Sequence, residues 1–255
     1  MGHALHTMIR DLHRRRGRER RGLALAEGVR LVEEVLAAGI ECRAVVVSPA
    51  LHGTERGRAL KAALEAAGPV TETTDEELAE LAATDHPQGV VAVVVPKRWV
   101  LDDIAIGPSG VVVVLDALQD PGNVGTIVRT ALALGAKGVV ALPGTAEIGN
   151  PKTMRSAMGA TFRLPTVPTD EAALSEWLVR HRVTVAATAM SGQPFDRARL
   201  TGPVALVLGN EGAGLQSDLG RNAPVTVAIP LEAGSESLNV AVAAGIFLYG
   251  ACRDR

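Results

Sequence analysis

The chain is poor in aromatic and sulfur-containing side chains. Its 255 residues include one Tyr, two Trp, three Phe and two Cys. Two cysteines cannot form a disulfide scaffold, and neither lies beside the histidines that a zinc site would need. No HExxH or CxxC pattern occurs, and His3, His6 and His13 lie in a polar N-terminal stretch where solvated imidazoles are favoured over metal ligands. We therefore expect no metal site.

Long hydrophobic runs are also missing. No uninterrupted apolar stretch approaches the ~20 residues that a membrane-spanning helix needs. The basic N-terminus has no apolar segment behind it, which disfavours a signal peptide. We expect a cytoplasmic protein with no membrane partner. Hydrophobic residues nevertheless make up 47% of the chain, so Leu, Val, Ile and Ala supply a substantial core and wholesale disorder is excluded.

The small net charge of −2 hides an uneven distribution. Residues 1–30 contain eight Arg and three acidic residues, whereas the rest of the chain contains 18 basic and 25 acidic residues. The stretch RDLHRRRGRERRG is compatible with a frayed, solvated tail. It is equally compatible with an arm that binds a phosphate backbone, for which the planar guanidinium is well suited.

Strand-like and helix-like segments alternate along the chain, which predicts an α/β protein. We predict a small N-terminal α/β domain over 1–97, a Pro- and Gly-containing linker over 98–110, and a second α/β domain over 111–255. The continuous apolar stretch VVVVLDAL at 111–118 is typical of a parallel sheet covered on both faces. Residues 10–40 are predicted to form a basic helix, a short strand and an amphipathic helix. Other predicted strands are 42–48, 89–95, 138–142, 183–188, 203–208 and 225–229, and other predicted helices are 54–67, 74–83, 126–135, 150–160, 170–182 and 238–251.

Three polar, Gly-containing loops of the second domain each follow a predicted strand, where open parallel sheets bind ligands. In DPGNVGTIVRT, Asn123 is placed to cap the next helix, and Arg129 lies six residues later. In ALVLGNEGAGL, Glu211 is an acid among glycines. In VAIPLEAGSESLNV, Ser237 is expected at or near a helix N-cap, and Asn239 is a poor helix former. Each loop alone also fits an ordinary structural turn.

A strand, a Gly-rich loop and a helix also suggest a nucleotide-cofactor oxidoreductase. The spacing disfavours this alternative, because G-x-x-G replaces G-x-G-x-x-G. The following strand ends VVALPG, with no acid to hold a ribose hydroxyl. Another alternative is a non-catalytic RNA-binding protein.

In this order, the three loops resemble the three motifs of the SpoU (TrmH-type) RNA ribose 2′-O-methyltransferases of the SPOUT superfamily. The resemblance covers residues 111–252, and NPKTMRSAMGATFRLP resembles the family's intermediate helix and loop. The residues that meet the motifs are Asn123, Gly125 and Arg129 in the first, Gly209, Glu211 and Gly214 in the second, and Ile229, Pro230, Leu231, Ser237, Leu238, Asn239 and Val240 in the third. LALAEGVRLVEEVLAAG and TDHPQGVVAVV resemble the ribosomal-protein-like RNA-binding domain that precedes the catalytic domain in many members.

The resemblance implies a knotted parallel-sheet domain with a trefoil knot, S-adenosylmethionine as cofactor, and a homodimer with a shared active site. It implies methyl transfer to a ribose 2′-hydroxyl of RNA, with rRNA favoured over tRNA, and no metal. The implied cofactor-binding residues are Leu208, Gly209, Ile229, Leu231 and Leu238, and the implied catalytic residues are Asn123, Arg129, Glu211, Ser237 and Asn239. The family proposal makes Arg129 the base; because a guanidinium stays protonated, a grip on the target phosphate is the alternative.

Overall fold

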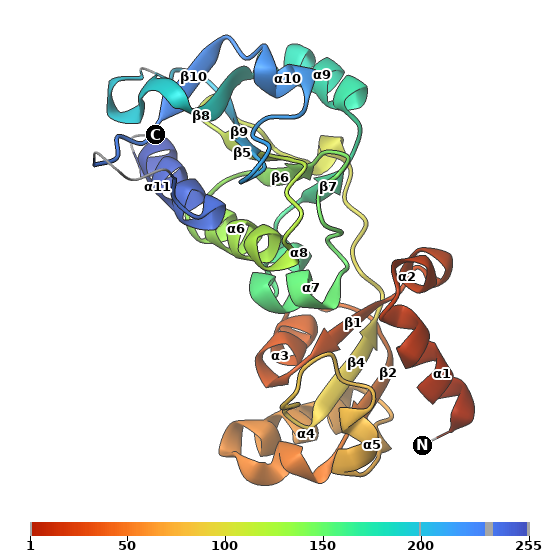
Figure 1. Cartoon of the computed structure of the whole chain (residues 1–255). Coiled ribbons are helices and arrows are strands. Elements are labelled where there is room, and N and C mark those ends of the chain that lie inside the picture. The colour runs from red at the N-terminus through yellow and green to blue at the C-terminus, as the bar shows by residue number, and fades with distance from the viewer. Residues whose placement is uncertain (1, 199, 233–236, 254–255) are drawn as a thin grey trace. The chain divides into compact units, whose positions relative to one another are not determined.

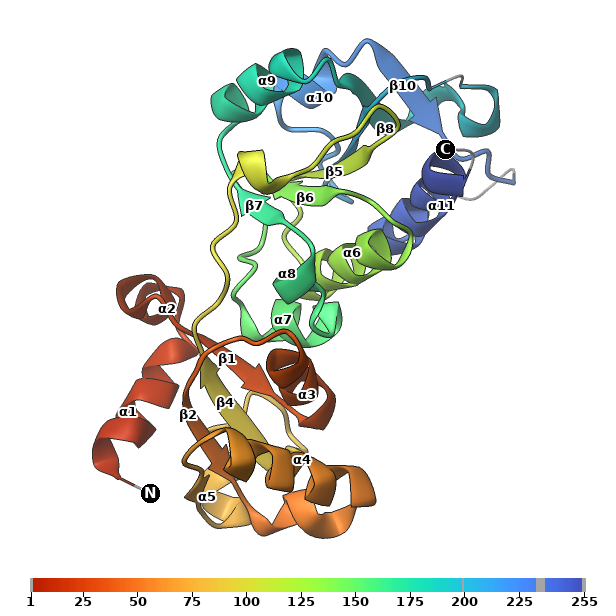
Figure 2. The same ribbon diagram turned by 180° about the vertical axis from the view of Figure 1, so that it is seen from behind.

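The computed structural model describes residues 2–198, 200–232 and 237–253. The chain forms two compact units (Figures 1 and 2). The first unit consists of Met1–Lys97 with Gly149–Phe162, and the second of Arg98–Ile148 with Arg163–Arg255. The segment 149–162 therefore packs in the first unit, although it lies within the range 111–255 that we assigned to the second domain.

The arginine-rich N-terminus is folded. It forms helices α1 (His3–Leu12) and α2 (Arg15–Arg21). Ile9 and Leu12 are fully buried in a hydrophobic cluster with residues of the first sheet, including Leu25 and Val91. A frayed tail is therefore the wrong description, because apolar side chains of α1 belong to the core.

The first unit contains a four-stranded sheet in the order β1-β4-β2-β3. The strands β1 (Ala24–Glu27) and β2 (Cys42–Val47) both pair antiparallel with β4 (Val90–Val94), and β2 pairs in parallel with the two-residue β3 (Thr71–Glu72). In the part of this unit before residue 98, the helices that follow α1 and α2 are α3 (Val29–Ala37), α4 (Glu55–Ala67) and α5 (Asp75–Ala79). The predicted helices and strands of residues 24–95 are present, and β3 was missed because two residues carry no periodicity.

The segment 149–162 completes the core of the first unit. It contains α7 (Pro151–Ala157) and most of α8 (Ala160–Arg163). Met154 and Phe162 are buried in the cluster formed by α3, α4 and the sheet. Nη1 of Arg155 also lies 3.3 Å from Oε2 of the buried Glu27. The packing of these apolar side chains explains why residues 149–162 belong to the first unit, although the residues on either side of them in the sequence belong to the second.

The second unit contains a six-stranded sheet in the order β10-β8-β9-β5-β6-β7, and every neighbouring pair is parallel. The strands are β5 (Val111–Asp116), β6 (Gly138–Ala141), β7 (Thr166–Pro168), β8 (Thr184–Pro194), β9 (Val204–Gly209) and β10 (Val225–Ala228). All six residues of β5 are buried, as its uninterrupted apolar stretch predicts. The α/β fold class predicted from the sequence is confirmed, and β8 is longer than predicted.

Helices cover both faces of the second sheet (Figures 1 and 2). The helices α6 (Pro121–Ala133) and α11 (Val240–Arg253) lie side by side on one face, and α9 (Glu171–Arg180) and the short α10 (Asp218–Arg221) lie on the other. The core on the α9 face includes Trp177 and also Ile104 from the predicted linker. Residues 98–110 therefore form part of the second unit rather than a free connection.

Two helices of the second unit begin at residues other than those predicted. The helix α6 begins at Pro121 rather than at 126, because Asp120 is its N-cap and accepts a 2.8 Å hydrogen bond from the amide of Asn123. Asn123 therefore lies in the first turn of α6 and does not precede the helix. The helix α11 begins at Val240, and Oδ1 of Asn239 accepts hydrogen bonds from two backbone amides in the first turn of this helix, at 2.9 and 3.3 Å.

The N-cap is thus Asn239, two residues after Ser237, which explains why a poor helix former stands at this position. Most of the small-residue loop before Ser237, residues 233–236, lies outside the described residues. Among the helices described, none is long and apolar enough to cross a membrane.

Candidate active site

A cavity of about 520 Å³ lies at the carboxyl ends of β9 and β10 in the second unit. Its position agrees with the general rule for ligand sites in open parallel sheets. Its walls are mostly apolar. The lining residues are Thr188, Ala189, Met190, Leu208, Gly209, Asn210, Glu211, Gly214, Leu215, Ala228, Ile229, Leu231, Ser237, Leu238, Asn239, Val240, Ala243 and Phe247.

The five residues predicted to bind the cofactor, Leu208, Gly209, Ile229, Leu231 and Leu238, all line this cavity. They come from the end of β9, from the chain after β10 and from the chain before α11, so three separate segments between residues 208 and 238 form one surface. Gly209 permits a close approach of backbone to backbone. A Cβ atom there would lie 2.8 Å from the carbonyl carbon of Gly214, so a larger residue would push the following loop away.

Three polar side chains from the three predicted loops meet beside the cavity. Nδ2 of Asn123 donates a 2.8 Å hydrogen bond to Oε1 of Glu211. Nδ2 of Asn239 donates to Oδ1 of Asn123 at 3.1 Å and to Oε1 of Glu211 at 3.3 Å. The same carboxylate oxygen accepts from the amide of Val240 at 3.3 Å. The carboxylate of Glu211 therefore fixes the orientation of both amide side chains, each of which keeps further hydrogen-bonding capacity.

Arg129 does not belong to this cluster. It is exposed on α6, does not line the cavity, and has no hydrogen-bond or ion-pair partner among the described residues. It follows Asn123 by six residues, which on a helix corresponds to a rise of about 9 Å and a rotation of about 240°. The guanidinium of Arg129 and the amide of Asn123 therefore leave α6 in different directions. Ser237 lines the cavity and is exposed.

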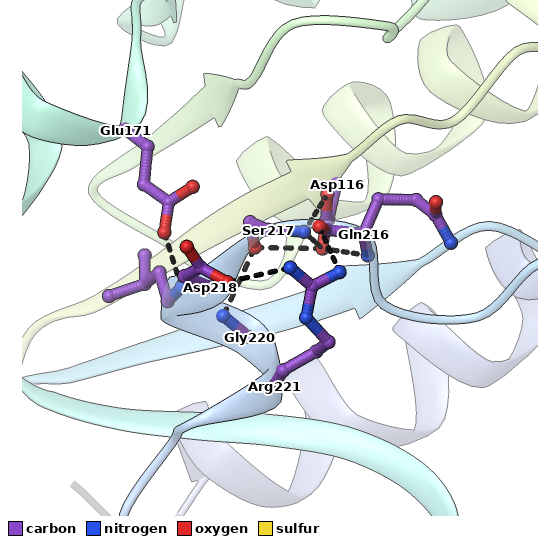
Figure 3. Close-up of polar contacts among 8 residues, drawn as sticks. Asp116, Glu171, Gln216, Ser217, Asp218, Gly220 and Arg221 are labelled. Atoms are coloured by element: carbon purple, nitrogen blue, oxygen red, sulfur yellow. Dashed lines mark hydrogen bonds and ion pairs between the residues drawn. The ribbon is translucent and has the colours of Figure 1, made fainter.

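Three polar residues that shape this region were not predicted from the sequence. Asp120 caps α6, and the buried Asp116 at the end of β5 binds the chain at Gln216 and Ser217 (Figure 3). Nδ2 of Asn210 donates to the carbonyl of Ala117 at 2.9 Å. A signal for Asp116 was available, because an acid that ends an apolar strand lies at the ligand-binding edge of a parallel sheet.

Nowhere in the described part of the chain do three or more His, Cys, Asp or Glu residues gather as a metal site would require. Cys42 and Cys252 are both half-buried and are not joined in a disulfide.

Residues 110–249 match the SpoU rRNA Methylase family. The chain belongs to this family. Residues 7–92 match the MRM3-like substrate binding domain. The resemblance inferred from the three motifs is thereby confirmed, and the oxidoreductase alternative is wrong.

Relatives with assigned substrates are similar to this SpoU methylase over most of its length. The 23S rRNA (guanosine(2553)-2′-O)-methyltransferase RlmP of Bacillus subtilis (strain 168) is 33% identical over 242 residues, 94% of this chain and 92% of the relative. The 23S rRNA (guanosine-2′-O-)-methyltransferase RlmB of Ralstonia nicotianae is 36% identical over 203 residues, 77% of this chain and 81% of the relative.

A solved structure of the same family shares the fold of the whole chain. The SpoU methyltransferase AviRb of Streptomyces viridochromogenes, in complex with the cofactor AdoMet, has a TM-score of 0.88 and 29% identity, with 100% of this chain and 98% of that chain covered. An AdoMet-bound rRNA methyltransferase of Sinorhizobium meliloti has a TM-score of 0.85 and 30% identity, with 99% and 95% covered.

Proposed function

We propose that this SpoU methylase is an S-adenosylmethionine-dependent 2′-O-ribose methyltransferase that acts on rRNA. The observation that carries the proposal is the meeting of Asn123, Glu211 and Asn239, one from each motif, beside a mostly apolar cavity. The relatives with assigned 23S rRNA substrates support rRNA rather than tRNA. We assign the RNA class and not the methylated nucleotide. An rRNA substrate also supports a cytoplasmic location.

The cavity fits S-adenosylmethionine in size and in chemistry. Its volume of about 520 Å³ lies within the ordinary range for small-molecule sites, roughly 300–1,000 Å³. Apolar side chains with a few backbone polar groups at strand ends suit a neutral heterocycle such as adenine. We assign the adenine-binding surface to Leu208, Gly209, Ile229, Leu231 and Leu238. When bound, the cofactor supplies an electrophilic methyl group on a sulfonium ion.

The polar residues have the task of holding the ribose and directing its proton. The amides of Asn123 and Asn239, oriented by Glu211, are placed to hydrogen-bond the ribose, and Ser237 contributes a further hydroxyl at the cavity. Arg129 cannot accept the proton of the 2′-hydroxyl, because its guanidinium stays protonated. Its role is to hold the target phosphate through its planar fork, and the phosphate or a water accepts the proton.

We further propose a homodimer with a shared active site. Val242, Ile246 and Tyr249 recur on one face of α11 and are 52%, 43% and 55% exposed, an apolar stripe of the kind that marks an interface. The helix α6 lies beside α11, and a Cβ atom at Gly245 would lie 3.8 Å from Thr130, the neighbour of Arg129. An Arg129 that is exposed here and absent from the cavity of its own chain is suited to the cavity of a second copy. A trefoil knot, which the family resemblance implies, belongs to the same proposal.

The deciding experiment maps 2′-O-methylation in total RNA from the source organism with and without the gene. We expect one position in rRNA to lose its methyl group, and purified protein with S-adenosylmethionine to restore the methyl group on RNA from the deletion strain. The matched control is the Asn239→Ala protein, which should fold and fail to restore it. Loss of a methyl group from tRNA alone would assign the other RNA class. Cofactor binding without transfer to any RNA would support the non-catalytic alternative.

A further inference from the structure

The carboxylate of Asp116 is buried without a cationic partner among the described residues. Asp116 is the last residue of β5 and is 2% exposed. Its Oδ2 accepts hydrogen bonds from the amide of Gln216 at 2.8 Å, from the amide of Ser217 at 2.9 Å and from the hydroxyl of Ser217 at 2.8 Å (Figure 3). A buried carboxylate is costly unless hydrogen bonds compensate for its lost hydration. All three donors come from one short segment about 100 residues later in the chain.

An acid suits this position better than a neutral side chain. Backbone amides and a hydroxyl supply the donors around Asp116, so both of its oxygens have to accept. An asparagine would offer one acceptor oxygen and would turn an NH2 group toward N–H donors. A Cβ atom at Gly220 would lie 3.2 Å from Oδ2, so the carboxylate is also enclosed by the start of α10. The contacts therefore specify a carboxylate at the end of β5.

The segment that Asp116 binds is the end of the loop 209–217, which forms one wall of the cavity. Gly209, Asn210, Glu211, Gly214 and Leu215 of this loop line the cavity, and Asp116 does not. Asp116 can therefore influence a cavity ligand only through the loop.

The beginning of the loop is tied to the same strand end. Asn210 donates from Nδ2 to the carbonyl of Ala117 at 2.9 Å, and its Oδ1 accepts from the amides of Gly212 and Ala213, each at 3.0 Å. Ala117 has a φ of 57°, which is unfavourable for a residue with a side chain, so its conformation depends on contacts of this kind. Residues 116 and 117 thus hold the loop at both of its ends.

We propose that Asp116 is a positioning residue for cofactor binding: its buried carboxylate fixes the loop 209–217 in the conformation that binds S-adenosylmethionine and that directs Glu211 toward Asn123 and Asn239. The proposal rests on the assignment of the cavity as the cofactor site. It assigns Asp116 no contact with the cofactor or with RNA.

The test measures S-adenosylmethionine dissociation constants of the full-length protein by calorimetry, together with thermal unfolding and steady-state kinetics. Asp116→Asn keeps the size of the side chain and should weaken S-adenosylmethionine binding by about tenfold or more, as expected for loss of hydrogen bonds to a charged group. The KM for the cofactor should rise in parallel, and the KM for RNA should stay within about twofold, because the substrate-binding unit is untouched. A purely structural lesion would lower the active fraction, and hence kcat, without raising the KM for the cofactor alone.

The matched control is Glu171→Gln. The carboxylate of Glu171 accepts from the amide of Leu219 in the same polar region, yet neither residue lines the cavity (Figure 3). This variant should bind S-adenosylmethionine within about twofold of the wild type. A second control, Asp170→Ala, removes the N-cap of α9 and should lower thermal stability without changing the cofactor affinity.

A folded Asp116→Asn protein with wild-type cofactor affinity would overturn the proposal, and so would an equal loss of affinity in Glu171→Gln. If Asp116→Asn does not fold, Ser217→Ala decides, because it removes the 2.8 Å hydroxyl hydrogen bond and leaves Asp116 two amide donors. We then expect cofactor binding to weaken several-fold, and wild-type affinity in Ser217→Ala would overturn the proposal. Failure of the wild type to bind S-adenosylmethionine would overturn the proposed function, and with it this role of Asp116.

Discussion

The N-terminal helices and α6 both present arginines, and the two regions employ them differently. In α1 and α2, Asp11 binds Arg20 and Arg21, each at 2.7 Å, and Arg15 binds Glu19 at 2.7 Å. Arg18 is 5% exposed and donates to two carbonyls. Arg129 of α6 is exposed and has no partner among the residues described. A cluster of arginines in the sequence therefore need not be a ligand-binding surface, whereas a single arginine left without partners can serve one.

The largest expected effect comes from replacing Arg129 or Asn123 of α6. We expect Arg129→Ala and Asn123→Ala each to lower the rate of methyl transfer by about a hundredfold or more, the scale seen when a group that stabilises a transition state is lost. The dissociation constant for S-adenosylmethionine should stay within a few-fold, because neither side chain lines the cavity. Transfer of labelled methyl groups and calorimetry measure the two quantities. Loss of cofactor binding in either variant would contradict the division of roles.

A second, slightly smaller effect is the recovery of activity when two inactive variants exchange subunits. Inactive Arg129→Ala and inactive Asn239→Ala proteins are mixed and allowed to exchange subunits. If the two residues act across a dimer, each mixed dimer contains one site with both lesions and one intact site. Random exchange then restores about a quarter of the wild-type activity, since half of the dimers are mixed and half of their sites are intact. If both residues act within one chain, the mixture stays inactive, and a fully active monomer would contradict the proposal.

A third effect concerns stability rather than catalysis. Nη1 of Arg18 donates to the carbonyls of Leu12 at 2.8 Å and His13 at 2.9 Å, which joins α2 to the end of α1. Arg18→Ala should lower the free energy of unfolding of the first unit by about 2–3 kcal/mol, because buried acceptors lose a charged donor. Chemical denaturation measures this. The exposed neighbour Arg16 is the matched control, and Arg16→Ala should change stability by less than about 0.5 kcal/mol.

Much of the fold could be predicted from the sequence. The apolar stretches at 42–48, 89–95 and 111–118 became β2, β4 and β5, because short, Val-rich stretches favour strands over helices. The start of α6 was predicted five residues late, since PGNVG reads as a turn although Pro121 and the Asp120 cap begin a helix there. The position of 149–162 in the first unit could not be predicted, because it depends on where Met154 and Phe162 find a core.

The candidate site, too, could be predicted only in part from the sequence. Asn123, Glu211 and Asn239 were predicted from motifs, and the structure adds that one carboxylate oxygen binds both amides. The family, the enzyme class and the α/β fold are confirmed by the comparisons. Asp116 was not predicted: its position at the end of an apolar strand was a usable signal, but its partners lie about 100 residues away and could not be found from the sequence. Roles of individual site residues stay predictions.

A fourth, smaller effect tests whether exposed arginines of the N-terminal helices bind RNA. Arg10, Arg14 and Arg16 are exposed and have no partners within the described chain, unlike Arg18, Arg20 and Arg21. If these three bind RNA phosphates, replacing all three with Ala should flatten the slope of log K against log[salt] by about 0.7–0.9 for each phosphate that is no longer bound. Binding titrations at several salt concentrations measure the slope. An unchanged slope in the triple variant would show that these arginines bind no RNA. Deletion of residues 1–21 is not a suitable test, because it also removes Ile9 and Leu12 from the core.

The smallest expected effect is the pH dependence that the paired arginines confer. The guanidinium of Arg21, together with that of Arg20, holds the pKa of Asp11 below its ordinary value of 3.8. The folded protein thus binds this proton less tightly than the unfolded chain does, and stability depends on the difference. The stabilisation is complete above pH 3.8 and is lost as the pH falls through the lower pKa of the folded state.

Asp11→Asn should therefore reduce the decline of the melting temperature below pH 4 and leave its decline at alkaline pH unchanged. Because Arg20 is well exposed, the difference should be modest and should shrink as salt is added, and an acid decline as steep as that of the wild type would show that the Asp11 pairs contribute nothing to stability.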